Sequence, residues 1–332
     1  MHKLMTVMRF MAFAVLGASP LAGWSQAGDW PSIVAAARKE GRVQFYTGQT
    51  LPVANRIVAG FRKQYPDIAV EVTRGPSGEI LAKVDQERAA NLDGADVFVS
   101  TEVAWFTDRA RENRLLRPAG PALKAWPAQF LAQGVAPIVG SDPFVIVYNR
   151  NLLPNPPKTY ADLLGPEYRG KLGTMELAST VLVAWYEWLE KTQVPDFLVR
   201  LKAQQPKLYT AIAQSVASGE IAVSPFGIPS AITPLVQQGA PLGFVVPTPV
   251  MGNLYGAGAL NWSRRPNAAL VLVDYVMSAE GQTLWHGGGE SASPLSGIPG
   301  AIAMSAITPF DPSRYPAAAV NKSREHWNRI FK

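Results

Sequence analysis

The sequence predicts an α/β protein made of two halves, each with a mainly parallel sheet flanked by helices, and with a stiff crossing between them. Strands and helices alternate through residues 43–100, which is typical of a parallel sheet with crossover helices. The same alternation returns after residue 171, beyond a proline-rich stretch at 148–173. A chain of 332 residues has enough material for two such halves.

Each element of the first half has its own periodic pattern. Apolar residues recur every three or four positions in the expected helices and alternate in the expected strands, with Gly41 and Pro66 as stop signals. The expected elements are a helix at 32–39, a strand at 43–47, a helix opened by Pro52, a strand at 68–72, a helix carrying Ile80, Leu81 and Val84, and a strand at 96–100.

The ends of these strands predict where a ligand binds. In open α/β sheets, ligands bind beyond the carboxyl ends of the strands, where the helices begin. These ends are polar, small or charged, and the expected contacts are Thr47, Gly48, Gln49, Thr50, Thr101 and Glu102. Arg74 is a further candidate, because a guanidinium can hold a carboxylate or phosphate with two hydrogen bonds. The alternative for Arg74 is a solvated arginine in a turn.

The stretch at 148–173 predicts a stiff connector. Pro154, Pro156 and Pro157 fix their own φ and bias the preceding residues toward extended backbone. We therefore expect a rigid extended crossing between the two halves at this point.

The second half offers two further strand ends. A strand at 171–175 leads to a helix at 181–189, and Ser179 and Thr180 at the helix start predict an anion site of hydroxyls and free N–H groups. An ordinary helix cap is the alternative. The strand end at 222–230 adds Gly227 and Ser230, and Phe226 as an apolar contact.

The remaining pattern predicts the domain organisation. Residues 244–247 read as the return crossing, Asn267 as the cap of one long helix through Trp285, and the tail as a final amphipathic helix. The expected parts are a signal peptide at 1–27, lobe one at 28–142 and 247–300, lobe two at 143–246, and a C-terminal helical tail at 301–332.

The N-terminus predicts export. Lys3 and Arg9 precede an apolar run at 10–16, and Ser25-Gln26-Ala27 has the small-x-small pattern of a cleavage site. A short buried helix is the alternative, since the run is too short to span a bilayer. No cysteine follows it, which excludes a lipid anchor. We expect a mature protein in the periplasm, cleaved near Ala27.

Composition excludes several classes of function. The absence of cysteine removes disulfides, thiolate metal sites and cysteine nucleophiles. The formal charge of +6 falls to +4 without Lys3 and Arg9, and the basic residues are scattered, which argues against nucleic-acid binding. His286 precedes a glycine run, but no G-x-S-x-G, H-E-x-x-H or phosphate-binding glycine motif is present. We expect no catalytic residue, metal site or cofactor.

Six segments in order resemble one family. They are AARKEGRVQFYTGQ, FRKQYPDIAVEV, ADVFVSTE, PPKTYADLLGPEYRGKLG, SGEIAV and VDYVMSAEGQ. Together they resemble the extracellular solute-binding proteins of family 1, the receptors of ABC importers, in the branch that includes ferric-iron receptors. The resemblance implies a two-lobe periplasmic-binding-protein fold, type II-like, which encloses a ligand by hinge closure.

The resemblance also bears on the ligand. Iron receptors of this branch use a histidine after strand one, a glutamate after strand three, a tyrosine pair in lobe two, and an anion at a serine-bearing helix start. Here Thr50 stands at the histidine position, Glu102 matches the glutamate, Pro229 and Ser230 replace the tyrosines, and 178–180 keeps the anion loop. We therefore expect a small anionic or zwitterionic ligand, with ferric iron as the alternative.

The predicted function is that of a monomeric periplasmic solute receptor that delivers its ligand to an ABC permease in the inner membrane. A sensory-only binding module and an enzyme are the alternatives. Neighbouring permease and ATPase genes would distinguish the receptor from the sensory module, and substrate turnover would identify an enzyme.

Overall fold

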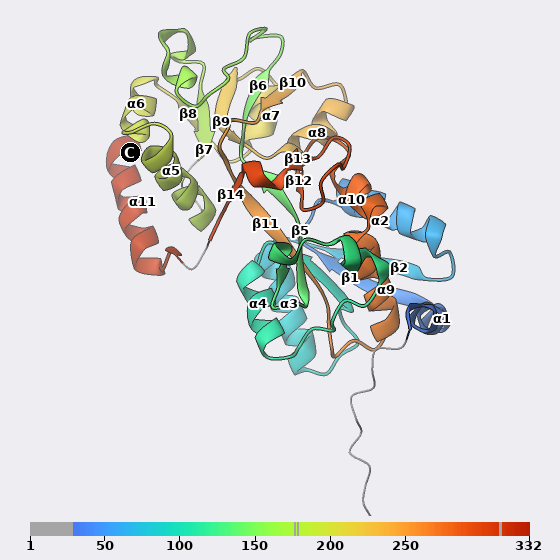
Figure 1. Ribbon diagram of the computed structural model, residues 1–332. Helices are drawn as coiled ribbons and strands as arrows, with labels where there is room; N and C mark the ends of the chain where they lie inside the picture. The colour runs from blue at the N-terminus through green and yellow to red at the C-terminus, as the bar shows by residue number, and fades with distance from the viewer. Residues whose placement is uncertain (1–28, 176, 178, 312–313) are drawn as a thin grey trace, which may run out of the picture.

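The computed structural model describes residues 29–175, 177, 179–311 and 314–332. The expected signal peptide and Gly28 lie outside these residues. Two bodies are visible in Figure 1, one built on a large sheet and the other on two small sheets, and we call them the first and second lobes. In the described parts of the chain, no helix combines the length and apolar character needed to cross a membrane.

The first lobe contains most of the strands. Its helices and strands, in chain order, are α1 (Trp30–Glu40), β1 (Arg42–Thr47), α2 (Leu51–Gln64), β2 (Ala69–Arg74), α3 (Ser77–Ala89), β3 (Val97–Ser100), α4 (Val103–Arg111), β4 (Leu131–Ala132), β5 (Ala136–Pro143), β11 (Val250–Ala259), α9 (Pro266–Met277), α10 (Ala279–His286), β12 (Ala292–Ser293), β13 (Ile302–Ala303) and β14 (Ile307–Pro309). Short 3₁₀ helices at Pro121–Ala125, Ala128–Phe130 and Met304–Ala306 complete it.

The large sheet has the order β13-β12-β5-β11-β3-β1-β2, with β14 on β11 and β4 on β5. β1 pairs in parallel with β2 and β3, so Thr47 and Arg74 are register partners at the carboxyl edge. β11 is antiparallel to both β3 and β5. The three neighbouring parallel strands expected from 43–100 are confirmed, and they place the predicted rim on one edge.

Both faces of this sheet are covered by helices. Phe45 and Val99 pack on the side of α1, α2, α9 and α10, whereas Tyr46 and Phe98 face α3 and α4. Because successive strand residues point to opposite faces, these apolar runs are what a strand buried on both faces requires.

The long helix expected through Trp285 is two helices. α9 begins at Pro266, and the Glu40 carboxylate accepts hydrogen bonds from the N–H groups of Asn267 and Ala268, so Asn267 is not the cap. Ser278 is extended, with ψ of 158°, and its Oγ accepts from the Gly281 N–H at 3.0 Å to cap α10. The chain therefore turns at Ser278, where the apolar pattern predicted one continuous helix.

The second lobe holds shorter strands. Its helices and strands are β6 (Val145–Asn149), β7 (Gly173–Met175), α5 (Thr180–Thr192), α6 (Phe197–Ala203), β8 (Lys207–Tyr209), α7 (Ile212–Ala217), β9 (Val223–Gly227), α8 (Pro229–Gln237), β10 (Leu242–Val245) and α11 (Ala317–Phe331), with 3₁₀ helices at Asp162–Leu164 and Pro166–Tyr168. β10, β6 and β9 pair antiparallel, and β7 pairs with β8 in parallel. The α/β class is confirmed, but pairing in the three-stranded sheet differs from the parallel expectation.

The proline-rich stretch is not the crossing. The chain leaves the large sheet between β5, which ends at Pro143, and β6, which begins at Val145. It returns to the large sheet between β10 and β11. The prolines follow β6 inside the second lobe, where Tyr160 donates from its hydroxyl to the Phe144 carbonyl at 3.0 Å. Proline has no N–H to donate to a strand ladder, so this stretch runs outside the sheet. It lies after the crossing, within the second lobe.

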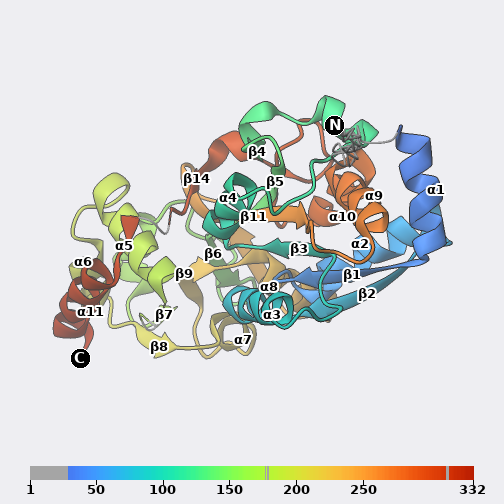
Figure 2. The same ribbon diagram turned by 90° about the horizontal axis from the view of Figure 1, so that it is seen from below.

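The C-terminal tail joins both lobes. β13 and β14 belong to the large sheet, whereas α11 packs on α5 and α6 of the second lobe. Figure 2 shows α11 at the end of the molecule opposite α1. The expected final helix is confirmed, and two strands precede it.

Candidate functional site

The predicted rim forms a hydrogen-bonded edge at the ends of β1, β2 and β3. Thr47 is fully buried, and its Oγ1 accepts from the Gln49 N–H at 3.0 Å. The Gly48 N–H donates to the Val99 carbonyl at 2.9 Å, and the Arg74 Nε donates to the Gln49 carbonyl at 3.2 Å. Parallel strand ends thus hold these residues together, as the sequence rule expects.

Gly48 and Thr101 meet at the start of α3. The Thr101 N–H donates to Ser77 Oγ at 3.3 Å, and a Cβ at Gly48 would overlap that same oxygen. The close approach explains why glycine occupies position 48. Gly48 and Thr101 therefore shape the rim with their backbones.

Glu102 stands at the N-terminus of α4. Its side chain is half-buried, and burial raises the pKa of the carboxyl above its usual range. Within the ranges that the structure describes, no protein donor or cation pairs with this carboxylate. Glu102 can therefore accept hydrogen bonds from a solute.

The two lobes touch at a buried polar cluster around Asp142, the residue before the end of β5. Ser230, from α8 in the second lobe, donates from Oγ to Asp142 Oδ2 at 3.0 Å, and the Tyr255 hydroxyl donates to the same oxygen at 3.3 Å. The Gln49 side chain also faces this carboxylate. We call Gln49, Asp142, Ser230 and Tyr255 the Asp142 cluster.

The electrostatics of this cluster follow from its burial. Burial raises the pKa of Asp142 to about 7, and the negative charge of Glu290 also raises it. Hydrogen bonds from Ser230, Tyr255 and Gln49 lower this pKa in part. Burial also raises the pKa of Tyr255, so its phenol stays protonated and donates. Asp142 Oδ1 is buried without a hydrogen-bond partner in the described part of the chain.

A small cavity of about 10 Å³ continues the contact between α2 and α8. Thr50 and Arg56 line it from the first lobe, Ser230 lines it from the second, and Glu290 pairs with Arg56 beside it. Thr50 Oγ1 is buried without a partner among the described residues. A cavity of this size is close to the minimum for one water molecule, so the lobes are in direct contact here.

Ser179 caps α5. Its Oγ accepts from the Leu182 N–H at 3.3 Å, which is the ordinary capping role that the sequence left open. Ser179 is exposed, and Thr180 is the first residue of the helix. Ala178, the remaining residue of the loop, lies outside the described part.

The strand end at 222–230 divides into two environments. Ser230 reaches the first lobe, but the Phe226 ring packs in the second-lobe core, with ring centroids 5.0 Å from Phe144 and 5.2 Å from Trp185. Gly227 is buried, and a Cβ there would crowd Val147 at 3.0 Å. Phe226 therefore faces the core rather than a solute.

Sequence reasoning did not single out Asp142, Tyr255 or Glu290. The available signal was the polar pair Ser141-Asp142 between two apolar strands, directly before the expected lobe boundary. The role of Asp142 depends on its hydrogen-bond partners Ser230 and Tyr255, which are 88 and 113 residues away in the sequence.

Comparison with known proteins identifies the family. The family described as bacterial extracellular solute-binding protein matches residues 43–289, more than half of the chain. The chain belongs to this family. An uncharacterized protein of Haemophilus influenzae is 24% identical over 314 residues, which cover 85% of each protein. The resemblance drawn from the six segments is confirmed.

Solved structures share the fold. A substrate-binding protein of an ABC transporter from Agrobacterium tumefaciens is 19% identical, with a TM-score of 0.70 over 88% of this chain and 94% of that one. Iron-bound HitA from Pseudomonas aeruginosa is 19% identical, with a TM-score of 0.63 over 88% and 99%. AfuA from Actinobacillus pleuropneumoniae, with fructose-6-phosphate bound, is 20% identical, with a TM-score of 0.59 over 88% and 98%. The two-lobe fold is therefore confirmed, and by its family the protein is a bacterial extracellular solute-binding protein.

His286 has a structural role in this solute-binding protein. Its Nδ1 lies 2.5 Å from Ser291 Oγ and its Nε2 lies 3.0 Å from Gln282 Oε1, and the ring is fully buried. Over the described ranges, no group of three or more histidines and carboxylates is arranged to hold a metal ion.

Burial of His286 makes folding stability sensitive to acid. Burial lowers the pKa of His286 from 6.5 to about 3, so this contribution is complete above pH 6.5 and is lost as pH falls from 6.5 toward 3. Between pH 7 and 4.5, the wild type should lose about 2–3 kcal/mol more unfolding free energy than His286→Gln. Urea titrations at both pH values measure this, with the exposed His326→Gln as the control that keeps the wild-type slope. Equal losses in wild type and His286→Gln would contradict it.

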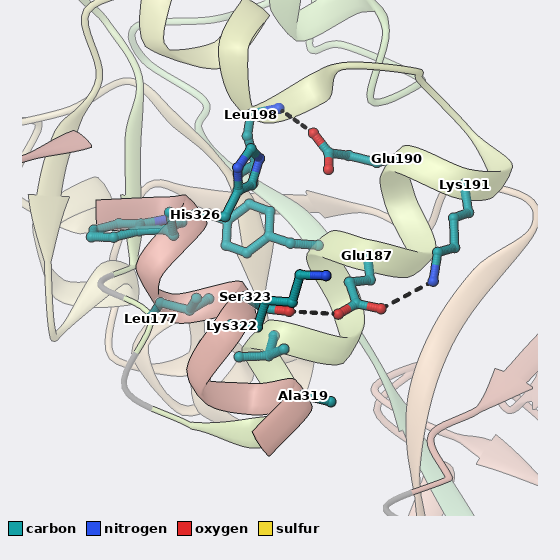
Figure 3. Close-up of a pocket in the computed structure, with 12 residues that line it drawn as sticks. Leu177, Glu187, Glu190, Lys191, Leu198, Ala319, Lys322, Ser323 and His326 are labelled. Carbon is teal, nitrogen blue, oxygen red and sulfur yellow. Dashed lines mark hydrogen bonds and ion pairs between the residues drawn. The ribbon is translucent and has the colours of Figure 1, made fainter. Parts of the chain in front are cut away.

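The solute-binding protein also has a groove away from the Asp142 cluster. It measures about 420 Å³ and lies between α5 and α11, as Figure 3 shows. Glu187 accepts from Lys191 at 3.0 Å and from Ser323 at 2.7 Å, and Glu190 accepts from the Leu198 N–H at 3.0 Å. Its carboxylates are thus occupied by groups of the second lobe itself.

Proposed function

We propose that this protein is a periplasmic receptor that encloses a small anionic or zwitterionic solute between its lobes and delivers it to the permease of an ABC importer. The observation that carries the proposal is the Asp142 cluster, in which Ser230 of α8 meets strand ends of the first lobe. Family membership supports the transport role. We propose the lobe boundaries at 28–142 plus 247–300 and at 143–246, with the tail at 301–332 joining both.

Helix N-termini and one arginine favour a solute with an anionic part. Thr50, Glu102 and Ser179 are the N-cap residues of helices α2, α4 and α5, and helix N-termini present free N–H groups and a positive dipole end. Arg74 adds a positive charge at the same edge of the sheet. Hydrogen-bond donors that are already positioned supply affinity at low ordering cost.

One carboxylate extends the choice of ligand class to zwitterions. Glu102 is half-buried without a protein partner among the described residues, and an ammonium group would satisfy it. Simple anions and zwitterions are therefore the two ligand classes to compare, by thermal shift with paired compounds that differ only in an amino group. A bound solute raises the melting temperature by mass action.

The helix start of α5 gives a mutational test. Once a phosphonate, amino acid or aromatic acid from the screen shows a shift, Ser179→Ala with Thr180→Val should weaken its binding by about 1–3 kcal/mol, because buried acceptors of the solute lose donors. Calorimetry measures this. Ser278→Ala removes the matching cap from α10 in the first lobe and should leave affinity unchanged. Unchanged affinity in the double variant would place the anion elsewhere.

The ferric-iron alternative enters the same screen. HitA is described as iron-bound, and it shares the fold. Of the four ligand positions compared above, this chain keeps Glu102, with Thr50, Pro229 and Ser230 at the others. Ferric iron prefers hard anionic oxygen donors, so added Fe³⁺ should give no charge-transfer band. A coloured, tight complex would replace the proposed ligand class with iron.

A further inference from the structure

Asp142 occupies a place where both lobes and both connecting strands meet. It lies in β5 one residue before Pro143, after which the chain enters the second lobe, and the returning strand β11 supplies Tyr255. Ser230 comes from α8 in the second lobe, and Gln49 comes from the rim. Asp142 is 2% exposed, and Ser230 and Tyr255 are 6% and 7% exposed. The contact therefore exists only while α8 lies against the first lobe.

We infer that Asp142 is a proton-linked latch, which holds the lobes closed through Ser230 when its carboxyl is protonated and weakens closure when it is ionised. This inference rests on the proposed closure of the lobes and adds a regulatory device to it. The geometry carries it: Oδ2 accepts hydrogen bonds from Ser230 and Tyr255, and the other carboxyl oxygen, Oδ1, is buried without a hydrogen-bond partner among the described residues. An ionised Oδ1 in that position costs free energy that a neutral one does not.

The charged surroundings favour the neutral form. Glu290 faces Asp142 with a second negative charge, and Arg56 is engaged with Glu290. The positive charge of Arg74 acts to lower the pKa of Tyr255, and the Arg74 Nε donates a hydrogen bond to the Gln49 carbonyl. Tyr255, Ser230 and Gln49 supply neutral partners only. Among the described residues, no cation pairs with Asp142.

The direction of the pH effect follows. When α8 moves away, Asp142 gains solvent and its pKa returns toward the ordinary value of about 4. The closed form, with a pKa of about 7, then binds the proton more tightly than the open form. The ratio of closed to open protein therefore falls by up to about tenfold per pH unit between pH 4 and 7, and it is constant above pH 8.

The chain permits a direct measurement, because it contains no cysteine. Leu92→Cys in the first lobe and Val199→Cys in the second place labels at residues that are 60% and 56% exposed. Spin–spin distance distributions between these labels, in the solute-free mature protein from pH 5 to 8.5, report closed and open populations. We expect the short-distance population to decline from pH 5 to 7 and then to level.

Three variants in the labelled background separate the latch from a general acid effect. Asp142→Asn keeps an oxygen for both donors without a titrating proton, so its populations should not change with pH. Ser230→Ala should lower the closed-to-open ratio about fivefold at pH 5, since one hydrogen bond is lost. Thr233→Ala, in the same helix and lining the same small cavity, should match the wild type.

Populations that are independent of pH in the wild type, or an unchanged pH dependence in Asp142→Asn, would overturn the inference. Ser230→Ala identical to the wild type would do the same, even where Asp142→Asn fails to fold. The measurement uses no ligand. A screen without a thermal shift would therefore count against the proposed ligand class and leave this result standing.

Discussion

Replacing Arg265 with methionine should lower the free energy of unfolding by about 3–5 kcal/mol. Arg265 is 6% exposed, and its Nε donates to the fully buried Asp96 carboxylate at 2.6 Å. It also pairs with Asp93, whose carboxyl pKa these contacts hold below its usual range. Removal of the guanidinium leaves the charge of Asp96 in the protein interior, where the remaining donors among the described residues are the Gln44 N–H and the Ser263 hydroxyl.

Urea unfolding monitored by circular dichroism measures this loss. The neighbouring residue supplies the matched control. Arg264 is exposed and donates to the Asn91 carbonyl, so Arg264→Met should change stability by less than about 0.5 kcal/mol. Adding Asp96→Asn to Arg265→Met should recover part of the loss, since the buried charge is then gone. A loss below 1 kcal/mol in Arg265→Met would show that water reaches Asp96.

Replacing Trp327 with alanine should cost a similar amount, about 3–5 kcal/mol, by leaving a cavity in the second-lobe core. Trp327 is 1% exposed and lies in α11, where its ring stacks on Phe331 at 4.7 Å between centroids. It belongs to the same buried cluster as Trp185 and Tyr160, although the chain visits the first lobe between them. The C-terminal helix is therefore part of the second-lobe core.

The control is the adjacent His326→Ala, which removes an exposed side chain from the same helix and should change stability by less than about 0.5 kcal/mol. Unfolding followed by both tryptophan fluorescence and circular dichroism tests whether the two lobes unfold together. A loss under 1 kcal/mol for Trp327→Ala would mean that α11 can detach without disturbing the core.

The sequence was most informative where the apolar periodicity and the rule that ligands bind at strand ends point to the same residues. Alternating and helical patterns placed β1, β2 and β3, and the rule for strand ends then brought Thr47, Gly48 and Thr101 to one edge. It could not give strand direction in the second lobe, because an apolar run such as β6 looks the same in parallel and antiparallel pairs. The proline-rich stretch was wrongly predicted to connect the two halves for a related reason. Its prolines predict a stiff backbone, but they do not indicate which elements the segment connects.

The candidate site was less predictable than the fold. Asp142 and Tyr255 lie on the two strands that connect the lobes, and their hydrogen bond spans 113 residues of sequence. Phe226 was expected to touch a solute, yet its strand turns that ring toward Trp185 while Ser230, four residues later, faces the first lobe. Which side of a short strand faces the core is decided by packing, and a single sequence does not contain that information.

The path of the chain between the lobes has a mechanical consequence. It passes between them after β5, before β11 and again after β14, and the first two passages are tied together where the Phe144 N–H donates to the Met251 carbonyl at 2.8 Å. Two passages that are cross-linked in this way allow the lobes to bend about them and resist twisting or sliding. Under the proposed closure, each opening would return the same faces to the same alignment, and capture of a solute would follow a single angle between the lobes.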